Sequence, residues 1–227
     1  MRWRSRLAVL ATSLLLGASI AAAQSPAVES DARLASVRGR LDAALEAARR
    51  GGLPEEWLRA KIAEGLSKRV PPPLIAAAVE ALGQRMRAAD AMVRDLGPAR
   101  GRRPLLRAAV DALSAGAPEA RVRGLIAQVR ERGGGAPEVR GALVTVAELA
   151  ERGFSGEAAV EAAAEAHRRG GSRGLGELTR RARGIRDDVP GGRDRALRGL
   201  GRAVGAARGV DARRGGGDHG GRGRGPR

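Results

Sequence analysis

Residues 116–157 read GAPEARVRGLIAQVRERGGGAPEVRGALVTVAELAERGFSGE, and this stretch decides the fold. One motif occurs in it three times, at intervals of 19 and 18 residues: a glycine (Gly116, Gly135 and Gly153), an apolar residue, a proline or serine, and an acid. Glycine accepts the left-handed conformation that ends a helix, and proline or serine is favoured where the next helix begins. The acid then lies in the first turn, where the helix dipole stabilises its charge. We therefore expect short helices joined by tight turns.

The motif also occurs at Gly52, and a looser copy lies at Gly171. A fixed period of this kind is typical of helical arrays. Leucine, isoleucine and valine recur at helical spacing between the copies, and no segment shows the strict alternation of a β-strand. The expected fold is all-α: an irregular array of short antiparallel helices, about 18–19 residues per helix-turn unit, with one longer helix after the prolines at 71–73.

The apolar positions and the helix breakers predict the individual segments. In order, these are a helix over residues 30–50, a second helix from Pro54, the longest helix from 71–73 to Gly97, a basic loop at 100–103, four shorter helices from Pro104 to about Arg169, and a last helix around Leu175 to Ile185.

The first 23 residues have the layout of a secretory signal peptide. Three arginines precede an apolar run from Leu7 to Ile20, and small residues end at Ala23. The run is shorter than the roughly 20 residues that span a bilayer. We expect cleavage near Ala23, export by the general secretory route to the periplasm or the medium, and no transmembrane span afterwards. A signal that is retained as an anchor is the alternative.

Few residues in the chain suit catalysis. It has no cysteine, which excludes disulfides, thiolate metal sites and cysteine nucleophiles together. Of its two histidines, His167 lies near an expected helix C-terminus, where the dipole favours a polar or cationic side chain, and His219 lies in a glycine-rich tail. There is no Gly-x-Ser-x-Gly nucleophile elbow. We expect a non-enzymatic protein with no catalytic residue, no metal site and no cofactor.

Residues 190–227 differ in composition from the rest, with ten arginines, three aspartates and many glycines. Three glycines between 199 and 205 each cost near 1 kcal/mol in a helix relative to alanine, so we expect a disordered tail. The predicted organisation is a signal peptide at 1–23, a helical array domain at 24–189, and a disordered, arginine- and glycine-rich tail at 190–227.

The formal charge of the chain is +17, and nearly all of its basic residues are arginine. A GC-rich genome would produce this bias without any ligand. Arginine also binds phosphate and carboxylate groups bidentately. The candidate polyanion-binding residues are Arg100, Arg102, Arg103, Arg213, Arg214, Arg222 and Arg224.

Residues 61–75, KIAEGLSKRVPPPLI, resemble a segment of exported helical proteins of high-GC bacteria that have no assigned function. The resemblance extends over residues 52–170. It implies an exported location and a helical fold, and it transfers no active site.

Two functional hypotheses follow. The first is an exported, non-enzymatic interaction or structural protein with protein partners in the cell envelope, because stacked helix pairs present an extended surface. The alternative is an envelope-associated protein that binds a polyanion, an anionic lipid or polymer, through the tail and residues 100–103. Nucleic acid is not the expected partner, because an exported protein meets lipid and cell-surface polymer first.

Overall fold

The computed structural model describes residues 31–96, 99–185 and 192–204, and these ranges contain helices and no β-strand. The predicted all-α class is confirmed. The elements are the 3-10 helix η2 (Ala32–Val37) and the α-helices α1 (Arg38–Arg50), α2 (Glu55–Ser67), α3 (Pro72–Val93), α4 (Ala99–Ser114), α5 (Glu119–Glu131), α6 (Ala136–Glu151), α7 (Gly156–Ala182) and α8 (Gly192–Ala203). The predicted signal peptide at 1–23 lies outside the described residues.

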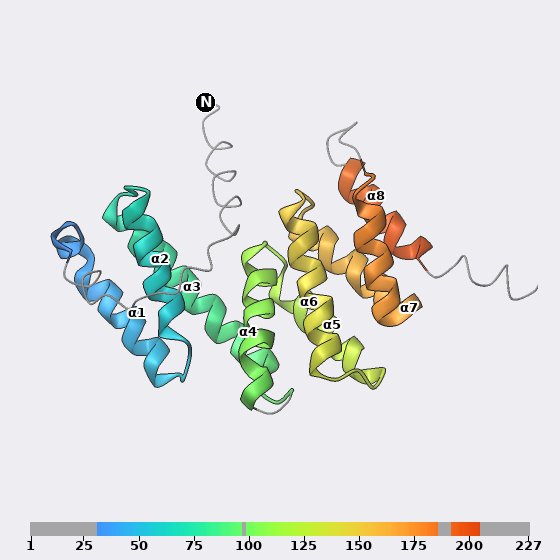
Figure 1. Cartoon of the computed structure of the whole chain (residues 1–227), viewed down its shortest axis with the longest axis horizontal. Helices are drawn as coiled ribbons and strands as arrows, with labels where there is room; N and C mark the ends of the chain where they lie inside the picture. The colour runs from blue at the N-terminus through green and yellow to red at the C-terminus, as the bar shows by residue number, and fades with distance from the viewer. Residues whose placement is uncertain (1–30, 97–98, 186–191, 205–227) are drawn as a thin grey trace, which may run out of the picture.

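The helices stack in sequence order into an elongated array (Figure 1). With η2 and α1 taken as one unit, every substantial contact joins elements no more than two steps apart along the chain. One continuous apolar core follows the array from Leu34 to Val204. Each helix is therefore held by its near neighbours and not by a common centre, as in other helical arrays.

Helix α7 consists of two helices that fold back on each other. A straight helix would hold Ser155 and Thr179 about 36 Å apart. However, Nη1 of Arg152, three residues before Ser155, donates to the carbonyl oxygen of Thr179 at 3.0 Å. The reversal lies at Gly171, whose φ of 56° is in the region that favours glycine. We call residues 156–170 α7a and residues 172–182 α7b. The looser copy of the motif thus marks a sharp turn.

The other copies of the motif lie at helix ends, as predicted, with one shift. Gly52, Gly116 and Gly153 have φ between 64° and 87°. In the third turn, however, the left-handed residue is Gly133, with φ 78°. Gly135 instead caps the N-terminus of α6, and its N–H donates to the Glu138 carboxylate at 3.0 Å. The acid therefore accepts a backbone hydrogen bond at the helix start, and the helix dipole also stabilises its charge.

The predicted basic loop at 100–103 is wrong. Helix α4 begins at Ala99, so these residues form its first turns and Pro104 lies inside the helix. A proline there removes one backbone hydrogen bond, to the carbonyl of residue 100. Arg102 supports these turns from outside, because its Nε donates to Asp90 of α3 at 3.1 Å.

The predicted start of the disordered tail at residue 190 is also wrong, because residues 192–203 form α8. Leu197 is completely buried, and Val204 is 2% exposed. A Cβ on Gly201 would lie 2.8 Å from the carbonyl oxygen of Ala162, so this glycine lets α8 approach α7a closely. The packing that glycine permits outweighs its cost of about 1 kcal/mol in helix propensity. Residues 205–227 lie outside the described residues.

Polar contacts hold the start of α8 on the turn between α6 and α7. The Arg193 guanidinium lies over the ring of Phe154, 4.7 Å from its centroid. The Asp194 carboxylate accepts the N–H of Ser155 at 3.0 Å. Since Ser155 is also the N-cap of α7, α8 is attached to the array at a structured helix start.

Candidate functional site

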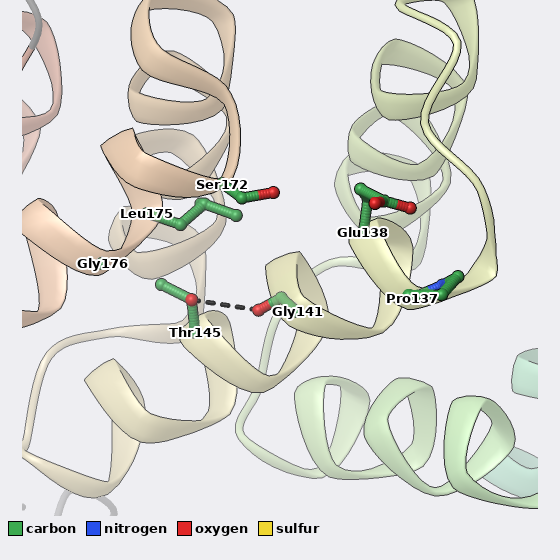
Figure 2. Close-up of a pocket in the computed structure, with 7 residues that line it drawn as sticks. All are labelled: Pro137, Glu138, Gly141, Thr145, Ser172, Leu175 and Gly176. Atoms are coloured by element: carbon green, nitrogen blue, oxygen red, sulfur yellow. Dashed lines mark hydrogen bonds between the residues drawn. The ribbon is translucent and has the colours of Figure 1, made fainter.

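An open pocket of about 310 Å³ lies between α6 and α7b (Figure 2). Its lining residues are Pro137, Glu138, Gly141 and Thr145 of α6 and Ser172, Leu175 and Gly176 of α7b. The Gly171 turn creates this pocket, because it brings the start of α7b beside the start of α6.

Two glycines within helices keep the pocket open. A Cβ on Gly141 or on Gly176 would meet no atom within 4 Å, so contacts within the described chain do not require glycine at either position. Each glycine lowers helix stability by about 1 kcal/mol relative to alanine. Their effect on the surface is to leave room between two neighbouring helices.

Two polar groups of the pocket, those of Thr145 and Glu138, already have partners within the fold. The Thr145 hydroxyl donates to the carbonyl oxygen of Gly141 at 3.0 Å, as Figure 2 shows. Glu138 accepts the N–H of Gly135. Together with the Leu175 side chain and the Ser172 hydroxyl, these groups form a small surface of mixed polarity. Such a surface can receive a side chain of a partner and offers it both apolar contact and hydrogen-bond acceptors.

His167 lies near this region and is buried, with 4% of its surface exposed. Its Nδ1 has no hydrogen-bond partner among the residues that the structure describes. Burial lowers the pKa of His167, the Arg132 guanidinium lowers it further, and the Glu138 carboxylate opposes the shift. The imidazole is therefore held in its neutral form, so of the polar or cationic side chain expected at this helix end, His167 is the polar one.

Two of the three candidate arginines of α4, Arg102 and Arg103, take part in ion pairs within the array. Nε of Arg102 donates to Asp90, which is also bound by Nη2 of Arg94 at 2.9 Å. Burial acts to raise the pKa of Asp90, but the two arginines outweigh it and the pKa is lowered. Arg103 forms an ion pair with Glu56 of α2. These contacts join α4 to α3 and α2.

The remaining candidates are not placed by side-chain contacts. Arg100 lies in the first turn of α4, and its side chain is not among those described. Arg213, Arg214, Arg222 and Arg224 of the tail lie outside the described residues, as does His219. The sequence-based interpretation did not identify the α6–α7b pocket, although two glycines inside apolar helical stretches were a visible signal of it.

Within the described ranges, no group of three or more histidine, aspartate or glutamate side chains could hold a metal ion. None of the helices in those ranges combines the length and the apolar character needed to cross a bilayer. Comparison with protein-family models, with curated proteins and with solved structures gives no match to this chain.

Proposed function

We propose that this protein is an exported, non-enzymatic helical-array protein that binds a protein partner of the cell envelope. The elongated array supports this function, because its helices contact only near neighbours and present their outer faces side by side. Surfaces of this kind are used by helical-repeat proteins to bind extended partners. The arginine-rich leader and the apolar run that follows it support export.

The pocket between α6 and α7b is the place where a partner side chain enters the array. Val144 precedes the pocket-lining residue Thr145 on α6 and is 38% exposed, which is unusual among the large apolar residues described. An apolar side chain next to an open pocket is a typical anchor point, because binding energy concentrates where a partner group is fully enclosed.

Filling the pocket tests this function. Gly141→Leu places a side chain in the pocket and raises helix propensity, and Gly124→Leu does the same on α5, where a Cβ also meets nothing within 4 Å. In crosslinked pull-downs from the cell envelope, we expect one protein to be captured by the wild type and by Gly124→Leu and to be lost with Gly141→Leu. Equal capture by all three proteins would refute the pocket as the binding site.

Export has a separate test. After cell fractionation and N-terminal sequencing, we expect the mature protein to begin at Gln24 in the exported fraction. A protein that keeps Met1 and fractionates with the cytoplasm would refute export, whereas one that keeps Met1 in the membrane fraction would indicate a retained anchor.

A further inference from the structure

Many arginines of the array are neutralised by acids on the same helix. Arg123 pairs with Glu119, and Arg169 pairs with Glu165, each at 2.6 Å. Four exposed arginines around the pocket end of the array differ from these, since they make no side-chain ion pair within the part of the chain that the structure describes. They are Arg130, Arg132, Arg140 and Arg173, and we call them the basic edge.

The basic edge lies at one margin of the array. Arg130 and Arg132 are at the end of α5, Arg140 is in the first two turns of α6, and Arg173 is at the start of α7b. The starts of α6 and α7b lie together because Glu138 and Ser172 line one pocket. In Figure 1 the connection between α5 and α6 lies at the lower margin of the array.

The local charge balance is positive. The carboxylates in the same segments are Glu131, Glu138 and Glu177; Glu138 binds the N–H of Gly135, and Glu177 pairs with Arg180 and Arg181 of its own helix. At the opposite margin the helix starts carry acids instead, such as Glu119 of α5 and Glu157 of α7a. The two margins of the array therefore differ in the charge that they present to a partner.

The end of α8 lies near the same place. A Cβ on Gly174, next to Arg173, would lie 3.5 Å from Val204 at the end of α8. The sequence that follows, residues 205–227, contains six further arginines. The last described residue thus lies near the basic edge, and the sequence that follows it is rich in arginine.

We infer that the basic edge binds the surface of a membrane rich in anionic phospholipid. This binding goes beyond the proposed partner function and extends the polyanion hypothesis from the tail to the array. Packed helices lie about 8–10 Å apart, so arginines on three successive helices spread over roughly 20 Å, which suits many headgroups and not one small anion. Guanidinium groups bind phosphate bidentately.

Membrane lipid fits this edge better than nucleic acid does. Single-stranded nucleic acid is bound by a basic groove in combination with aromatic side chains on which its bases stack. The described residues contain two aromatic side chains, Trp57 on α2 and the buried Phe154 at the other margin, and neither is part of the basic edge.

Vesicle co-sedimentation tests the inference. The purified protein, with the same N-terminus in every variant, is mixed with vesicles of phosphatidylcholine alone or with a third of phosphatidylglycerol. The edge variant combines Arg130→Gln, Arg132→Gln, Arg140→Gln and Arg173→Gln. The matched control combines Arg38→Gln, Arg69→Gln, Arg85→Gln and Arg87→Gln, which are also exposed and make no ion pair in the described ranges. Both variants lose the same charge.

One arginine near an anionic surface strengthens binding about fivefold. We expect the wild type to bind the anionic vesicles only, the edge variant to bind them at least about tenfold more weakly, and the control to lose less than about threefold. Equal loss in both variants, unchanged binding of the edge variant, or equal binding to neutral vesicles would overturn the inference. The inference would also be overturned if the wild type bound a single-stranded oligonucleotide more tightly than the anionic vesicles and the edge variant lost that binding. Gly141→Leu keeps all four arginines of the basic edge. A loss of partner capture with this variant can therefore be told apart from a loss of membrane binding with the edge variant.

Discussion

Replacing Gly201 by alanine tests whether α8 packs against α7a as the structure describes. The added Cβ would lie 2.8 Å from the carbonyl oxygen and 2.9 Å from the Cα of Ala162. Both are backbone atoms and cannot rotate away, so α8 must shift outward and Leu197 must lose part of its burial. Overpacking of this kind costs about 1–3 kcal/mol.

Gly199→Ala is the matched control. Gly199 lies on the same helix, and its Cβ would meet no atom within 4 Å. Each substitution gains about 1 kcal/mol of helix propensity. We therefore expect Gly199→Ala to raise the free energy of unfolding by about 1 kcal/mol and Gly201→Ala to change it by between zero and a loss of about 2 kcal/mol.

The assay is thermal and urea unfolding followed by circular dichroism at 222 nm. For a chain of this size, a difference of 1 kcal/mol corresponds to about 2–4 °C in Tm. Hydrogen exchange in 192–204 should become faster in Gly201→Ala and not in Gly199→Ala. If Gly201→Ala is as stable as Gly199→Ala, or if neither changes stability, the packing of α8 on Ala162 is refuted and a tail without structure from residue 190 is supported.

Three further substitutions address the turn, the buried ion pair and the histidine. Gly171→Val should destabilise the protein by on the order of 1–3 kcal/mol in urea unfolding, because its φ is positive; Gly170→Ala, whose Cβ meets nothing, should not. Asp90→Asn should cost on the order of 1–3 kcal/mol because two arginines lose their buried carboxylate, whereas the exposed Glu119→Gln should cost less than about 0.5 kcal/mol; equal losses would contradict this difference. The folded-state pKa of His167 is lowered, so its stabilisation is present above the unfolded value and is lost as the pH falls through the folded one. The free energy of unfolding should therefore decrease between about pH 7.5 and 5.5, and His167→Gln should lack that component; an identical pH profile in the variant would contradict it.

Local chemistry made much of the fold predictable. A helix end depends on a few consecutive residues, and a glycine in the left-handed conformation or a capping acid has the same preference in any tertiary setting. For this reason the turns at Gly52, Gly116 and Gly153 could be recognised from the motif, and the reversal at Gly171 from its looser copy. The all-α class followed from the period of the apolar residues, which is also a local property.

The candidate site was less predictable, because it combines residues that are close only in the folded chain. Glycines at 141 and 176 were visible in the sequence, but the pocket between them exists because α7 reverses and brings α7b beside α6. Likewise, the sequence marks Arg102 as a free cation in a basic loop, whereas the fold places it against Asp90, twelve residues away. Pairing between helices depends on their registry and has no local signature.

The sequence by itself thus determined the class of the fold, the helix boundaries set by glycine and proline, and the basic character of the chain. Only the tertiary structure decided that α8 exists within a glycine-rich segment, that His167 is buried and neutral, and which arginines remain without an acid in the described ranges. The physical reason is that helix ends are governed by the conformational preferences of neighbouring residues. Burial and charge pairing are governed instead by which helix faces meet in space. At Gly201, glycine would destabilise an isolated helix, but here it stabilises α8 because it allows close packing against Ala162.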